Sequence, residues 1–98
     1  MIAITRGDTD RIQVNFSCKA YYQEGKKLTL TVRTAKGEHK VISKEVSYPE
    51  NTFTIEHTDT KDLAYDKYIY DIQLSNEDMT RVKTLIVDYF VLNREVTF

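Results

Sequence analysis

Apolar residues recur at every second position of this chain, in one segment after another, with turn residues between the segments. The clearest runs are Ile12–Cys18, Leu28–Val32 and Tyr68–Leu74. Alternation with a period of two places the apolar side chains on one face of a β-strand and the intervening polar side chains on the other. The pattern therefore predicts a small all-β protein built around one buried core.

Turn residues divide the chain into about seven or eight strands, at the roughly 8–12-residue spacing typical of β-sandwiches. No linker, repeat or low-complexity segment interrupts the 98 residues. We therefore expect residues 1–98 to form a single immunoglobulin-like β-sandwich domain with mostly antiparallel strands. The expected strands are residues 2–4, 11–20, 28–34, 40–48, 52–57, 67–75 and 80–92.

Two of these strands have irregular patterns. The apolar phase of Lys40–Tyr48 is imperfect, which predicts an edge strand with a β-bulge, protected from pairing by Lys40 and Lys44. The apolar stretch Thr80–Leu92 is longer than one core strand needs, and we expect it to bend near Asp88.

Two local motifs lie between the strands. Tyr68 begins a core strand just after a turn that contains Leu63, which matches the tyrosine corner of immunoglobulin-like sandwiches. In that interpretation the Tyr68 hydroxyl bonds to the backbone of the turn and Leu63 closes the core; the alternative is that Tyr68 is simply a core aromatic residue. The residues Asp59–Asp62 have the pattern of a capping box and predict one short helical turn near Asp59–Leu63.

The sequence does not assemble a reactive site. Cys18 is in phase with the core residues of its strand, and His39 and His57 stand in separate segments, whereas a zinc site needs three or four convergent ligands. The acidic residues lack the spacing of a calcium loop, and the three glycines lie in three different turns. We therefore expect no enzymatic activity, no metal and no cofactor.

Charge and hydropathy limit the partners. The formal net charge is −1, which makes nucleic acid an unlikely partner, although basic residues and tyrosines interleave between Lys19 and Lys27. No apolar stretch approaches the roughly 18 residues of a membrane span, and the N-terminal residues lack the apolar region of a signal peptide. We expect no membrane association, no secretion through a signal peptide, and synthesis in the cytoplasm.

The chain resembles a family of small structural proteins of bacteriophages and prophages from Gram-positive hosts, which are immunoglobulin-like modules encoded among tail and baseplate genes. The residues that carry the resemblance span nearly the whole chain; the most distinctive are the Arg6-Gly7-Asp8-Thr9 turn before the strand Ile12–Cys18, and the ending Glu95-Val96-Thr97. The resemblance implies a non-enzymatic virion structural or assembly protein, made in the host cytoplasm and then incorporated into the particle, with other phage structural proteins as partners.

Such a module acts through its surface, so we expect a homo-oligomer or a stable complex in which exposed aromatic residues form the contacts. The candidate interface residues are Tyr21, Tyr22, Tyr65, Tyr89 and Phe98. The alternative is a small ligand-binding β-module that uses surface tyrosines to stack on carbohydrate or single-stranded nucleic acid.

Overall fold

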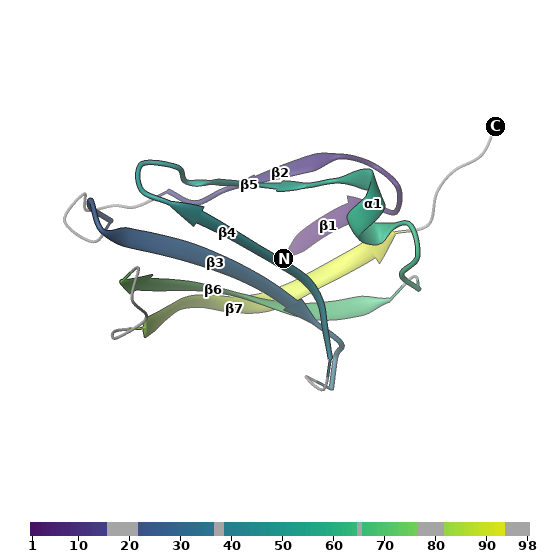
Figure 1. Cartoon of the computed structure of the whole chain (residues 1–98). Helices are drawn as coiled ribbons and strands as arrows, with labels where there is room; N and C mark the ends of the chain where they lie inside the picture. The colour runs from purple at the N-terminus through teal and green to yellow at the C-terminus, as the bar shows by residue number, and fades with distance from the viewer. Residues whose placement is uncertain (16–21, 37–38, 65, 77–81, 94–98) are drawn as a thin grey trace.

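The all-β class is confirmed by a computed structural model, which describes residues 1–15, 22–36, 39–64, 66–76 and 82–93 (Figure 1). These residues form seven strands and one helix of a single turn, α1. The elements, in chain order, are β1 (Ile2–Thr5), β2 (Asp10–Gln13), β3 (Lys26–Arg33), β4 (Lys40–Ser47), β5 (Thr52–Ile55), α1 (His57–Thr60), β6 (Lys67–Asn76) and β7 (Val82–Asn93).

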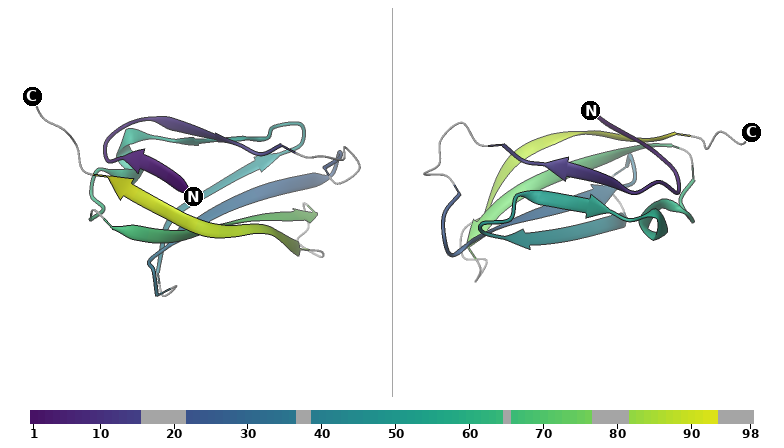
Figure 2. Two further views of the ribbon diagram at one scale, coloured as in Figure 1. Left: turned by 180° about the vertical axis from the view of Figure 1, so that it is seen from behind. Right: turned by 90° about the horizontal axis from the view of Figure 1, so that it is seen from above.

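The strands form one large sheet and one small sheet. The large sheet has five strands in the order β1-β7-β6-β3-β4, and β2 pairs with β5 in the small one. Every pairing is antiparallel except that of β1, which runs parallel to β7, so the large sheet is mixed. Two opposite views show the β2–β5 pair lying over one face of the twisted large sheet (Figures 1 and 2).

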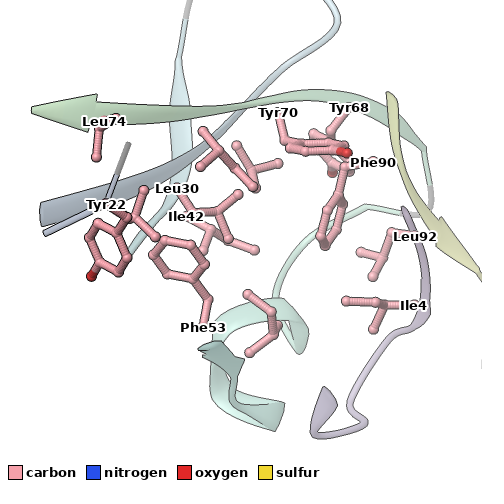
Figure 3. Close-up of a cluster of buried hydrophobic side chains, with 14 residues drawn as sticks. Ile4, Tyr22, Leu30, Ile42, Phe53, Tyr68, Tyr70, Leu74, Phe90 and Leu92 are labelled. Carbon is pink, nitrogen blue, oxygen red and sulfur yellow. The ribbon is translucent and has the colours of Figure 1, made fainter. Parts of the chain in front are cut away.

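The core fills the space between the two sheets, and the alternation in the sequence predicts it well. In β3 and β6, cross-strand neighbours on the inner face are Leu28 with Leu74, Leu30 with Ile72, and Val32 with Tyr70. All six side chains are buried. Phe53 of the small sheet and Phe90 of β7 point into the same cluster, which Figure 3 shows from the side.

Strand β4 confirms the predicted irregular edge. It is the last strand of the large sheet, and its pairing with β3 shifts register so that Val41 is the extra residue of a β-bulge. Lys40 is exposed, whereas Lys44 extends toward α1 and its Nζ lies 2.8 Å from Asp59 Oδ2. The basic residues of this edge thus both discourage further strand pairing and tie β4 to the helical turn.

The tyrosine corner is also confirmed. The Tyr68 hydroxyl donates a hydrogen bond of 2.8 Å to the carbonyl oxygen of Ala64, and Leu63 packs against the core. The turn between β1 and β2 contacts the same corner: Arg6 Nη1 donates to the Leu63 carbonyl oxygen at 3.3 Å, and the Gly7 N–H donates to Thr60 Oγ1 at 2.9 Å. These hydrogen bonds join the turn between β1 and β2 to the segment between β5 and β6, and both of these connections run from one sheet to the other.

The helical turn lies nearer the N-terminus than predicted. It spans His57–Thr60 rather than Asp59–Leu63, with Glu56 as the N-cap residue. The reason is that Asp59 caps the residue three positions before it: Asp59 Oδ2 accepts a hydrogen bond of 2.7 Å from the Glu56 N–H. Asp59 is therefore the third helical residue of the capping box and not its first member.

We predict that Tyr68→Phe lowers the free energy of unfolding by about 1–2 kcal/mol, because the Ala64 carbonyl oxygen loses its donor while the ring stays packed. Tyr89→Phe is the matched control, since Tyr89 is 48% exposed and should change stability by less than about 0.5 kcal/mol. Urea unfolding followed by circular dichroism measures both. Equal stabilities of the two variants would contradict the structural role of the corner.

We also predict that stability falls at alkaline pH. Burial is the main cause that raises the pKa of Tyr22, Tyr68 and Tyr70 above the usual value of 10.0, with nearby acidic groups adding to it. The unfolded chain releases the tyrosine protons near pH 10, whereas the folded protein holds them to higher pH. The contribution of these groups to stability is therefore fully present below pH 10 and is lost as the pH rises above it. Urea midpoints measured between pH 8 and about pH 11 should decline above pH 10. A flat profile would contradict the prediction.

Candidate interaction surface

The described part of the chain holds no assembled metal site and no membrane helix. No three side chains among its His, Cys, Asp and Glu residues lie close enough to hold a metal ion. None of the helical structure in the same residues is long and apolar enough to cross a membrane.

Tyr22 was predicted to lie on the surface, but it is buried. Its side chain is 8% exposed and belongs to the core cluster, because the ring turns inward and its hydroxyl donates to the carbonyl oxygen of Glu50. The edge of the neighbouring Tyr48 ring meets it, with the ring centroids 5.3 Å apart and the planes at 77°. Tyr48 is the exposed member of this pair, at 45%, and the sequence pattern did not identify it.

Of the other predicted interface residues, Tyr89 is described and is 48% exposed on β7. Tyr21, Tyr65 and Phe98 lie outside the described residues. Tyr89 is one of several large apolar side chains exposed on the same strand; the others are Val82, Ile86 and Val87, at 48%, 42% and 62%. Four exposed apolar residues within eight positions make this half of β7 the main apolar surface among the described strands.

The exposure follows from unequal strand lengths. Strand β7 pairs with β6 from Val82 to Val91, but with the short β1 only from Phe90 to Asn93. Along Val82–Tyr89 no described residue forms a strand on the side of β7 that faces away from β6. We call this segment the open edge of β7. Its location beside β1 is visible in Figure 2, where β7 is the yellow-green strand that continues beyond β1.

A β-bulge divides the open edge. Ile86 pairs with Ile72 and Thr84 with Gln73, so Leu85 is an extra residue in β7. Strand β7 thus runs continuously from Val82 to Asn93, and its irregularity lies three residues before Asp88, where a bend was expected. Because the bulge inverts the alternation, Lys83, Ile86 and Asp88 share the face that continues into the core, while Val82, Thr84, Val87 and Tyr89 share the outer face. The last set includes the three most exposed apolar residues of the strand.

Charged groups flank the apolar residues of the open edge. Asp88 Oδ2 lies 2.7 Å from the amino group of Met1, and Asp88 Oδ1 accepts the Tyr89 N–H at 2.7 Å. The hydrogen bond from the amino group is the largest of the causes that lower the pKa of Asp88 below 3.8. The Lys67 ammonium lies 4.7 Å from the centre of the Tyr89 ring, within cation–π distance. Because the pKa of Asp88 is lowered, its carboxylate is ionised at neutral pH.

Comparison with protein-family models, with curated protein sequences and with solved structures gives no match to this chain.

We predict that the open edge contributes little to folding despite its apolar character. Val87→Thr should change the free energy of unfolding by less than about 0.5 kcal/mol, because Val87 is 62% exposed. The same exchange at Val32, which is fully buried in β3, should cost about 1–3 kcal/mol, because it buries a hydroxyl group among apolar side chains. Urea unfolding of the two variants tests the contrast. A similar cost at both positions would show that Val87 belongs to the folding core.

Proposed function

We propose that this chain is an immunoglobulin-like interaction module that works without catalysis, through protein–protein contacts in the tail or baseplate region of a phage or prophage particle. The observation that carries the proposal is the open edge of β7, where exposed apolar side chains line a segment that pairs with β6 but has no second strand beside it among the described residues. Natural sheets usually protect such edges, so an apolar one marks a site for contact with another chain.

The strand order supports the immunoglobulin-like part of the proposal. In variable-type immunoglobulin sandwiches, strands G, F, C and C′ are neighbours in one sheet, and B and E lie in the other. Here β7, β6, β3 and β4 follow the same order, and β2 pairs with β5. The tyrosine corner also falls in the expected place, between β5 and β6, which correspond to strands E and F.

The phage setting rests on the resemblance described above, and its most distinctive motif has a structural use. In the Arg6-Gly7-Asp8-Thr9 turn, Gly7 has a φ of 87°, a left-handed conformation that favours glycine. The Asp8 N–H donates to the Thr5 carbonyl oxygen at 3.1 Å, and the neighbouring residues Arg6 and Gly7 bond to the tyrosine corner. The motif thus has a structural role in this chain, which is compatible with the proposed structural module.

The geometry gives less support to the alternative, stacking of tyrosines on carbohydrate or single-stranded nucleic acid. Tyr22 is buried, and the Lys67 ammonium lies over the ring of Tyr89. A stacking platform needs accessible ring faces. Protein contact requires only the apolar surface and the strand edge that β7 already presents.

We predict that the chain is a component of purified particles. Mass spectrometry of particles released from the source strain after prophage induction should detect it in a fixed ratio to a major tail protein. The uninduced culture, purified in the same way, is the control. Particles that contain the tail proteins but lack this chain would contradict the proposal.

A further inference from the structure

We infer that β1 is exchangeable between two copies of this chain, so that the β1 of each copy docks on the β7 of the other and links the two as a dimer. The inference goes beyond the proposed function and does not use the open edge of β7. Three features of the structure carry it: the limited pairing of β1, the apolar site that β1 fills, and the turn that joins β1 to β2.

Strand β1 is the shortest strand of the large sheet. It has four residues, and in the described part of the chain it pairs only with β7. The pairing is parallel, which is slightly less stable per residue than antiparallel pairing. Of its side chains, Ile4 is buried and Ile2 is partly buried. Local opening begins where few buried apolar contacts hold an element, so β1 separates from β7 more easily than the central strands separate from each other.

The site that β1 fills is apolar. Ile2 is the partner of Phe90 and Ile4 is the partner of Leu92 in the parallel pair, and both residues of β7 are buried. Figure 3 shows Ile4 beside Leu92 at this end of the core. Without β1 these side chains would meet water and the backbone of β7 would lose its hydrogen-bond partners. A vacated site therefore favours the binding of another β1.

A second copy of the chain supplies the segment that matches this site. Its β1 has the same four residues and the same register on β7, and the contact of the Met1 amino group with Asp88 forms again between the copies. Exchange of an identical element keeps the contacts of the docked strand, which makes it a low-cost route to a dimer. The exchange therefore requires no unoccupied edge on β7.

The turn between β1 and β2 has the features of a hinge. Gly7 has a φ of 87° in this turn, and the Asp8 N–H closes it with a hydrogen bond of 3.1 Å to the Thr5 carbonyl oxygen. Glycine adopts left-handed and extended conformations about equally readily, so Gly7 permits both a closed and an opened turn. The Gly7 N–H is bonded to Thr60 Oγ1, which keeps the turn attached to its own chain while β1 swings away.

Two single-cysteine variants test the exchange directly. Ala3 and Val91 are partners in the β1–β7 register, and neighbouring strands lie roughly 5 Å apart, within the Cα separation of a disulfide. With Cys18 replaced by Ala in both chains, Ala3→Cys is mixed with Val91→Cys at about 100 µM. A mixed disulfide, identified by intact mass, should form under mild oxidation, because the two cysteines meet only when the β1 of one chain lies on the β7 of the other.

Val87→Cys, mixed with Ala3→Cys in the same way, is the matched control. Val87 precedes Val91 by about 13 Å along the strand, so this mixture should form no mixed disulfide. A chain that carries both Ala3→Cys and Val91→Cys should close an internal disulfide when it is oxidised in dilute solution. With its β1 locked in place, that chain should stay monomeric at about 100 µM.

Substitution of the hinge glycine tests the role of the turn. Gly7→Val disfavours the left-handed conformation of the closed turn but not an extended hinge, so it should strengthen the dimer about tenfold or more. Gly25→Val is the matched control: Gly25 also has a left-handed φ, of 85°, but it lies between β2 and β3, so its substitution should not strengthen the dimer. Analytical ultracentrifugation from about 1 to 100 µM measures the dimer, and circular dichroism checks that each variant is folded.

The inference is overturned if Ala3→Cys and Val91→Cys form no mixed disulfide, or if Val87→Cys forms one as readily. It is also overturned if Gly7→Val and Gly25→Val change the dimer equally, because general loosening of the fold would then explain the association. The proposed function is judged separately, by the presence of the chain in particles. A chain that is found in particles but does not exchange β1 would keep the proposed function, and an exchanging chain that is absent from particles would keep this inference and reject the phage setting.

Discussion

The pairing of β3 with β6 is the interaction on which the rest of this structure depends. These strands lie at the centre of the large sheet and are in register along eight residues, with three buried apolar pairs on the inner face. Every other contact is arranged around them: β4 and β7 pair on either side, and the small sheet covers the same inner face. Loss of one of these side chains would open a cavity in the part of the core that all the strands share.

The function that we propose arises where this regular arrangement ends. Strand β7 has twelve residues, whereas β1 beside it has four. Phe90 and Leu92 are the buried residues of β7, and Leu85 packs against the core in part. Val82, Ile86, Val87 and Tyr89 are apolar but exposed, and the bulge at Leu85 sets which of them share a face. Length, composition and bulge together point to a strand shaped for contact with another chain.

The sequence predicts the central strands well because their alternation reflects burial directly, as in Leu28–Val32 and Tyr68–Leu74. The edge strand β4 and the tyrosine corner were also predictable, since each depends on a local signal: a broken phase in one case and the spacing of Leu63 and Tyr68 in the other. The helical turn was displaced because an aspartate can cap a helix from either of two positions.

The surface was harder to predict. Tyr22 continues the alternation of Ile12–Cys18, but it lies just beyond the expected strand 11–20, and its hydroxyl bonds to the distant Glu50. The apolar residues of β7 resemble core residues in the sequence, because hydrophobicity alone does not distinguish a side chain that meets its own core from one that meets another protein. Only the register with β6 and the short reach of β1 separate the two.

The position of β7 has a further consequence for how the protein is made. The first strand of the chain, β1, has β7 as its sheet neighbour, and β7 is the last described strand. In a growing polypeptide β1 therefore cannot dock onto the large sheet until the segment that forms β7 has been made. Contacts between residues so far apart in the sequence slow folding, so the parallel pairing of β1 with β7 is expected to be a late step in forming the large sheet.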